Sequence, residues 1–314
     1  MFNNYGIYGI LPYRYNDSMK FKENEMKRAM MFGLILTAAT AGGYADENGV
    51  FTSKVGQFEV FTLVEGERDG NAGILVGADE AVLNRYIPAG GFKHTANAFL
   101  IKTRRLGRQQ NILIDTGTGA GDVIIEKIRS LGAPPENIDA VLITHLHGDH
   151  FGSLQRDGRA VFTKAKIYLS ARELEYFTKT NVNPGAAAAL APYGSRVVTF
   201  EPGQLGQRLR EIIPGISPIA AYGHTPGHTI FLLQNRGERL LIIGDLLHVA
   251  LVQFPMPDIS ATYDMDQQAA ASVRRQVLDY AASNKIPVGG MHIVNPAVGS
   301  VETDGTGFKF TPAR

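Results

Sequence analysis

The sequence predicts a layered α/β fold, with a sheet core inside and helices outside. Seven short runs are rich in β-branched and other apolar residues and are bounded by turn residues; they cover 58–64, 98–102, 111–114, 140–143, 166–169, 230–233 and 240–243. Runs such as 140–143 and 240–243 are apolar on both sides, which is typical of strands covered on both faces. Helical periodicity appears between the strands, at 122–131, 170–178 and 267–282. Elements in this order favour helices packed outside a sheet core.

The helical segments carry local signals of their own. Ser170 followed by Glu173 has the spacing of a capping box at the start of the second helix. The third segment has an apolar residue about every three or four positions, as expected of a helix lying on a sheet. The alanine run 186–189 predicts a short helix or a lid. No repeat or Pro/Gly/Ser linker divides residues 46–314, so we expect one domain there.

Composition restricts the chemistry that this chain can perform. Its 314 residues have a formal net charge of only +1, which provides no field to attract nucleic acid or an anionic membrane. The chain contains no cysteine, so disulfides, thiolate ligands and a cysteine nucleophile are excluded. Any bound metal must be held by His, Asp or Glu, a ligand set that suits Zn²⁺ or a similar divalent ion.

Residues 1–45 have the pattern of an upstream extension followed by a secretory signal peptide. Lys27 and Arg28 precede an apolar run at 29–36, and Gly43 and Ala45 occupy the −3 and −1 positions of a cleavage site. The run is too short to span a bilayer. We therefore expect an exported, periplasmic or secreted protein, with no stable membrane insertion after cleavage. A buried N-terminal helix is the alternative.

A dense cluster of potential metal ligands occurs in the segment Thr144-His145-Leu146-His147-Gly148-Asp149-His150. Alternate residues of an extended or turning loop can point to one side, and Gly148 allows a sharp bend before the last two side chains. Chance occurrence of His-x-His-x-Asp-His in a chain of this size is about 10⁻³ or rarer. Surface histidines and a closed structural zinc site are the alternatives, and the latter normally favours cysteine.

Other polar residues follow predicted strands or tight turns. Asp115 and Asp245 each end an apolar strand, as the histidine cluster does. His228 closes the turn Tyr222-Gly223-His224-Thr225-Pro226-Gly227-His228, and His292 follows two glycines. Folds of this class usually place their chemistry at strand ends. Together with the first cluster, His228, Asp245 and His292 supply seven ligands for two ions.

These motifs resemble those of the metallo-β-lactamase-fold hydrolases over nearly all of residues 46–314. The resemblance implies a four-layer αβ/βα sandwich with a dinuclear metal site at the sheet edge. It assigns one divalent ion, with Zn²⁺ expected, to His145, His147 and His228. It assigns a second ion to Asp149, His150 and His292, with Asp245 bridging both. It also places Asp115 and His224 in an outer shell, where a carboxylate orients the histidines.

Within that superfamily, the segment 244–254 and the ending 299–312 are most similar to methyl parathion hydrolase and its relatives. This implies a metal-dependent hydrolase acting on organophosphate triesters, aryl esters or lactones as small-molecule partners. Acyl-homoserine lactonases of the quorum-quenching type share the seven ligands and are the alternative. They usually have a tyrosine where this chain has His248. His248 could donate to a developing oxyanion, or it could be a core histidine satisfied by backbone.

The predicted mechanism needs no serine or cysteine nucleophile. Two ions about 3.5–4 Å apart can share a bridging hydroxide that attacks phosphorus or a carbonyl carbon, with Asp149 orienting it. Substrate specificity would come from apolar pocket walls, for which the candidates are Phe92, Tyr176, Phe177, Tyr193 and Phe254. A non-catalytic periplasmic zinc-binding protein is a second alternative. A homodimer is compatible with the sequence, and so is a monomer.

Overall fold

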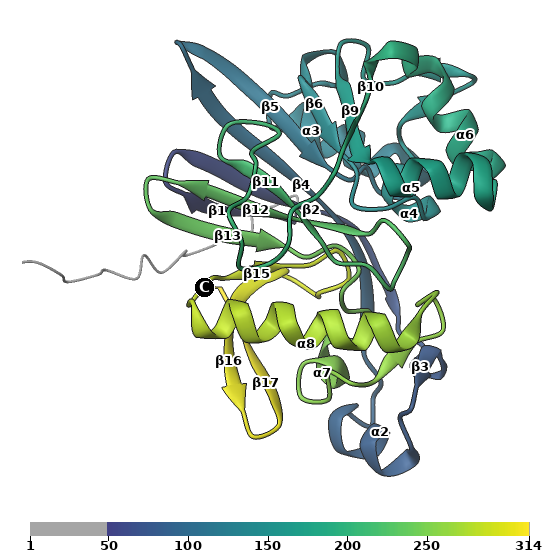
Figure 1. The fold of residues 1–314 in the computed structure, drawn as a ribbon, viewed down its shortest axis with the longest axis vertical. Coiled ribbons are helices and arrows are strands. Elements are labelled where there is room, and N and C mark those ends of the chain that lie inside the picture. The colour runs from purple at the N-terminus through teal and green to yellow at the C-terminus, as the bar shows by residue number, and fades with distance from the viewer. Residues whose placement is uncertain (1–48, 314) are drawn as a thin grey trace, which may run out of the picture. The chain divides into compact units, whose positions relative to one another are not determined.

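Two β-sheets form the centre of the protein in the computed structural model, which describes residues 49–313 (Figure 1). The first has the order β1 (Val50–Val55), β2 (Phe58–Asp69), β4 (Lys93–Arg105), β5 (Arg108–Ile114), β6 (Ala140–Leu142), β9 (Lys166–Ser170) and β10 (Val197–Phe200). The second has the order β11 (Ile216–Ala220), β12 (Thr229–Asn235), β13 (Glu238–Ile242), β15 (Val288–Gly289), β16 (Val298–Asp304) and β17 (Gly307–Pro312). All seven strands predicted from the sequence are present within these sheets.

Helices and two small strand pairs complete the described part of the chain. The α-helices are α2 (Glu80–Tyr86), α3 (Val123–Ser130), α4 (Gly148–Phe151), α5 (Ala171–Glu175), α6 (Pro184–Leu190), α7 (Ala250–Gln253) and α8 (Gln267–Ser283). The small pairs join β3 (Leu75–Val76) to β14 (Ser260–Ala261), and β7 (Gln155–Arg156) to β8 (Arg159–Ala160). No helix within residues 49–313 has the length and hydropathy needed to cross a membrane.

The central strands bury side chains on both faces because their residues alternate between two cores. In β4, Phe99 and Ile101 belong to the core that also contains the second sheet, whereas Leu100 belongs to the core that contains Ile124 and Ile128 of α3. Figure 1 shows α3, α5 and α6 beside the first sheet and α8 beside the second. The order of layers is therefore helix, sheet, sheet, helix, which confirms the predicted αβ/βα sandwich.

Local sequence signals account for two of the helices that cover the sheets. In α8, Ala270, Val277, Leu278 and Ala281 are buried at helical spacing, and the Asp266 side chain caps the helix by accepting from the Ala269 N–H. The alanine run lies in α6, which begins after Asn183. The Asn183 side chain accepts from two backbone N–H groups of the first turn.

The predicted capping box at the start of α5 is wrong. Ser170 precedes the helix, but its hydroxyl makes no side-chain cap and has no hydrogen-bond partner in the described structure. The carboxylate of Glu173 is fully buried and accepts from groups distant in the sequence instead. Long-range donors therefore take the place of the local reciprocal bond. The α-helix ends at Glu175, and a turn of π-helix follows at Tyr176–Thr180.

The strand arrangement brings the ends of both sheets together at one edge. Strands β5 and β6 are parallel, and Asp115 and the segment 144–150 follow their carboxyl ends. Strands β13 and β15 are also parallel, and they lead into Asp245 and His292. His228 immediately precedes β12. This edge is therefore where the histidines and carboxylates singled out from the sequence converge. The predicted extension and signal peptide, 1–45, lies outside the described residues.

Candidate metal centre

The loop that carries the His-x-His-x-Asp-His motif is anchored by Asp115. One oxygen of this buried carboxylate accepts from the Thr144 N–H at 2.8 Å, and the other accepts from the Thr144 hydroxyl at 2.7 Å. The second oxygen also accepts from Nδ1 of His150 at 2.7 Å. Since Nδ1 of His150 is used in this bond, Nε2 is the nitrogen that faces the site. The outer-shell role predicted for Asp115 requires such a hydrogen bond to a ligand histidine.

Three ring nitrogens converge in a first donor group made of His145, His147 and His224. Nε2 of His145 lies 3.1 Å from Nδ1 of His147 and 3.1 Å from Nε2 of His224. The distance from Nδ1 of His147 to Nε2 of His224 is 3.0 Å. Nitrogens in a tetrahedral site with Zn–N bonds of about 2.0–2.1 Å lie about 3.3 Å apart. The triangle of nitrogens therefore has nearly the size that a shared metal requires.

A second donor group contains Asp149, His150, Asp245 and His292. Nε2 of His150 lies 3.6 Å from Oδ1 of Asp149 and 3.3 Å from Oδ1 of Asp245. Nε2 of His292 lies 3.0 Å from Oδ2 of Asp245, while its Nδ1 donates to the Thr95 carbonyl at 2.7 Å. Nε2 of His150 and Oδ1 of Asp245 are buried and have no hydrogen-bond partner in the described structure. Buried polar atoms without partners are costly, so these two fit a bound cation.

Asp245 lies between the two donor groups. Its Oδ2 is 3.5 Å from Nε2 of His224 and 3.7 Å from Nε2 of His145, both in the first group. Its Oδ1 faces His150 in the second group. Burial alone would raise the pKa of Asp245, but the surrounding histidines hold that pKa well below its usual range. The structure thus places one ionised carboxylate where it can contact both groups.

The structure directs His224, and not the predicted His228, into the first donor group. Nε2 of His228 accepts from the Asp245 N–H at 3.1 Å, and its Nδ1 donates to the Ala221 carbonyl at 3.0 Å. Both ring nitrogens are therefore used in backbone bonds. His224 instead directs Nε2 into the first group and donates from Nδ1 to Asp264 at 2.9 Å. The turn offers two histidines four residues apart, and only the folded geometry distinguishes them.

Burial keeps several of these imidazoles neutral. It lowers the pKa of His224 to about 3 and that of His228 to about 4. Burial also lowers the pKa of His145 well below its ordinary value. A metal binds the neutral form of histidine, so a proton does not need to be displaced from these rings near neutral pH.

All eight histidines of the chain gather in this region, including His94, His224 and His248, which lie outside the predicted ligand set. The ring of His248 stacks on His292 at 5.3 Å, and its Nε2 lies 3.4 Å from Oδ2 of Asp245. The ring of His94 lies on His292 at 4.6 Å. Nδ1 of both His94 and His248 is buried without a hydrogen-bond partner in residues 49–313. The structure therefore places His248 beside the donor groups. The sequence alone had left both a site role and a core role open for this residue.

The five aromatic residues predicted to line the pocket separate into two sets. Phe177 lies with its ring 6.1 Å from that of His147, and Tyr176 packs on Phe177. The prediction is wrong for Tyr193, which is buried and donates its hydroxyl to the Leu154 carbonyl, and for Phe254, which is buried against Phe310. Phe92 packs into a separate apolar cluster around Val249 and Val252. Tyr193 and Phe254 are therefore aromatic residues of the two cores and not of the site.

Asp264 is a site residue that the sequence analysis missed. Its Oδ1 accepts from His224, and its Oδ2 accepts from the Ala261 N–H at 2.9 Å and from Arg274 at 3.3 Å. Arg274 is fully buried and also donates to the carbonyls of Leu246, Pro257 and Ile259. The carboxylate thus fixes the orientation of His224, as outer-shell carboxylates of metal-binding histidines do.

Replacing Asp264 with asparagine is expected to weaken zinc binding by about 10–100-fold, the usual cost of losing such a partner. Competition with a chromophoric chelator would measure the affinity. Asp279→Asn, on the exposed face of α8, is the matched control. An affinity unchanged in Asp264→Asn would show that His224 does not depend on this carboxylate.

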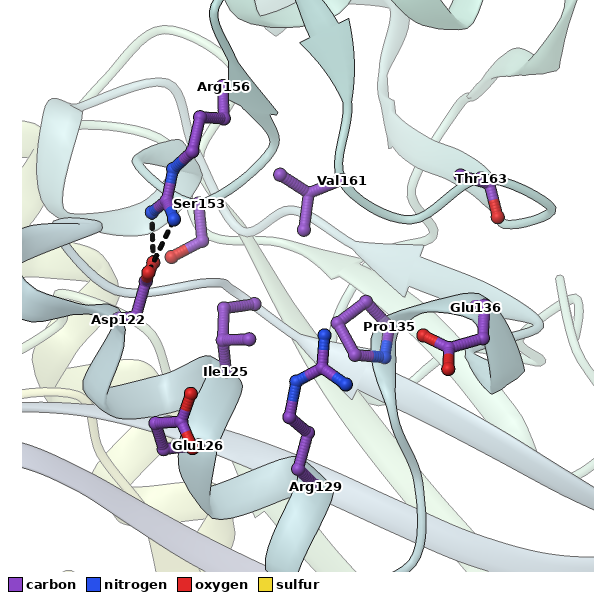
Figure 2. Close-up of a pocket in the computed structure, with 10 residues that line it drawn as sticks. All are labelled: Asp122, Ile125, Glu126, Arg129, Pro135, Glu136, Ser153, Arg156, Val161 and Thr163. Carbon is purple, nitrogen blue, oxygen red and sulfur yellow. Dashed lines mark hydrogen bonds and ion pairs between the residues drawn. The ribbon is translucent and has the colours of Figure 1, made fainter.

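A separate surface cavity of about 220 Å³ lies beside α3 (Figure 2). Its lining includes Ile125, Arg129, Ser153 and Val161, and Figure 2 shows the ion pair between Arg156 and Asp122 at its edge. None of the eight histidines lines it. The candidate centre is therefore defined by converging donor atoms and not by this cavity.

Comparisons with known proteins identify the family of this chain. The metallo-beta-lactamase superfamily model matches residues 92–284. The chain is 27% identical to Ribonuclease TTHA0252 of Thermus thermophilus over 190 residues, which is 58% of this chain and 42% of the relative. It is 28% identical to the probable metallo-hydrolase YflN of Bacillus subtilis over 162 residues, which is 47% of this chain and 59% of the relative. The chain thus spans about half the length of the curated relatives it matches.

Solved structures include similar folds over most of this chain. The hydrolase AbOPH of the beta lactamase superfamily is similar with a TM-score of 0.73 and 27% identity, covering 87% of this chain and 98% of that chain. AidC, a dizinc quorum-quenching lactonase, has a TM-score of 0.71 and 22% identity, with 88% and 98% covered. At 22% identity, the similarity to AidC shows the fold alone. With the family model matched over more than half of its residues, the chain belongs to the metallo-β-lactamase superfamily.

Proposed function

We propose that this superfamily hydrolase uses two divalent metal ions, with Zn²⁺ as the expected metal, to cleave ester-type bonds in small molecules. The observation that carries the proposal is the position of Asp245, whose carboxylate lies between two separate groups of metal-ligand type. His145, His147 and His224 would hold one ion. Asp149, His150 and His292 would hold the other, with Asp245 shared. When bound, such ions supply Lewis acidity and lower the pKa of water towards neutrality.

The residues of the chain would divide the remaining work. Asp149 is the most accessible member of its group, with 31% of its side chain exposed, so it can orient an attacking water and accept its proton. His248 lies beside Asp245 and can donate to the oxygen on which negative charge develops. Asp115 and Asp264 orient His150 and His224 through Nδ1.

Apolar side chains near the centre favour a substrate with an apolar group. Among residues 49–313, four of the six exposed large hydrophobic residues lie within three positions of His248, Asp264 or His292. Tyr263 is 52% exposed with its ring 5.5 Å from His248, and the Met265 N–H donates to the His224 carbonyl. Leu251 and Val294 are exposed three residues after His248 and two after His292. Aryl esters, lactones with an acyl chain and organophosphate triesters all have such a group.

Similarity to the solved structures supports this substrate range as a proposal. AbOPH is a hydrolase with 27% identity, and AidC, of similar fold, is a lactonase. We retain the methyl parathion hydrolase-like branch as the leading assignment within the family. Acyl-homoserine lactone hydrolysis is the second candidate, because His248 can donate to a lactone carbonyl from the position where lactonases usually have tyrosine. The basic, apolar and small residues at 27–45 lead us to propose that the protein acts outside the cytoplasm.

A substrate panel tests the proposal. We expect the zinc-loaded protein to hydrolyse at least one of 4-nitrophenyl acetate, an N-acyl-homoserine lactone and paraoxon. Chelation should abolish the activity, and added Zn²⁺ should restore it. If protein shown to contain two metal ions hydrolyses none of the three substrates, the proposal of an ester hydrolase is rejected and a non-catalytic zinc-binding protein is favoured.

A further inference from the structure

Glu173 of α5 is a buried carboxylate to which the mechanism above gives no role. Its side chain is fully buried, and it lies on a helix that contributes no metal ligand. One oxygen accepts from the Leu146 N–H at 2.8 Å. The other accepts from the Thr225 hydroxyl and from the Gly227 N–H, each at 2.8 Å. Three donors on two distant segments therefore meet on one carboxylate.

The two segments that Glu173 joins are the two that form the first donor group. Leu146 lies between His145 and His147, and Thr225 follows His224 directly. The second segment also lies against α5, since a Cβ on Gly227 would be 2.3 Å from the Glu173 backbone nitrogen. The nitrogens of this group are 3.0–3.1 Å apart only while the two segments keep this relative position.

We propose that Glu173 is a positioning residue that sets the metal affinity of the first donor group by fixing these two segments to one another. The inference rests on the metal site proposed above and extends it to a residue that touches no ligand atom. Glu173 also adds a buried negative charge near a site that would hold two cations. Burial raises the pKa of Glu173, and the three donated hydrogen bonds oppose that rise.

The substitution Glu173→Gln tests the proposal because it preserves the shape of the side chain but removes one of its two hydrogen-bond-accepting oxygens. An amide has one oxygen, so its NH₂ group must face either the Leu146 N–H or the pair of donors from Thr225 and Gly227. At least one donor is then left without an acceptor. Glu175→Gln is the matched control, because Glu175 lies on the same helix and is exposed.

We would titrate metal-free full-length protein with Zn²⁺ against a chromophoric chelator, and record thermal unfolding of the same metal-free samples. Glu173→Gln should bind one of two ions about 10–100-fold more weakly, with the other ion bound within about twofold of wild type. Glu175→Gln should match wild type for both. A purely structural role would lower the unfolding temperature while leaving the zinc affinity of the folded protein unchanged, which would overturn the proposal.

Thr225→Val provides a second test in case Glu173→Gln does not fold. It removes a single hydrogen bond and keeps the carboxylate, so we expect a smaller loss of affinity at the same ion. Wild-type affinity for both ions in Thr225→Val and Glu173→Gln would refute the positioning role. Wild-type protein that fails to bind two zinc ions would instead refute the metal site itself.

Discussion

Replacing Asp245 with alanine is expected to lower kcat/KM by about 10³-fold or more, because metal-ion catalysis contributes several kcal/mol and each 1.36 kcal/mol is tenfold in rate. The carboxylate lies within 3.3 Å of His150 and 3.5 Å of His224, so its loss removes the one acceptor that both donor groups share. The variant should also bind fewer than two ions. Initial rates with an aryl ester and elemental analysis of the same sample would measure both effects.

Asp279→Ala is the control for this change. It deletes the same side chain from the exposed face of α8, and it should leave rate and metal content unaltered. Asp245→Ala protein that keeps two metal ions and the wild-type rate would refute the bridging assignment.

Glutamine substitutions at His224 and His228 are expected to have opposite outcomes. His224→Gln should lose one metal ion and reduce the rate by about 10²-fold or more, since it removes a nitrogen from the first group. His228→Gln should retain both ions. A glutamine amide can accept from the Asp245 N–H and donate to the Ala221 carbonyl, as His228 does.

Metal content per protein, measured after gel filtration, would separate the two variants. His228→Gln with one ion lost and His224→Gln with both retained would support the assignment made from the sequence and contradict the one made from the structure. Thermal unfolding of the metal-free variants would control for loss of folded protein.

The fold could be predicted because its signals are local. Strands such as β6 and β13 are apolar on both faces, and burial on both faces requires covering layers of the kind observed. The strand-end residues Asp115, His145 and Asp245 also converge at one edge, as their positions at the ends of apolar strands predicted. Periodicity and turn residues carry this information within a few positions of the chain.

The features that could not be predicted depend on partners distant in the sequence. Asp264 lies 40 residues from His224, and Glu173 lies 52 residues from Thr225. The local pattern around Glu173 indicated a capping box, and hydrogen bonds to distant donors replaced it. Likewise, nothing near Tyr193 or Phe254 distinguishes a core aromatic from a pocket aromatic, because that difference arises only when the layers pack.

Anomalous diffraction at the zinc absorption edge, from crystals of protein purified without a chelator, tests the central claim most directly. We expect two peaks on opposite sides of Asp245. One should be bounded by His145, His147 and His224, and the other by Asp149, His150 and His292. A single peak, or a peak coordinated by His228 in place of His224, would contradict the proposed dinuclear centre.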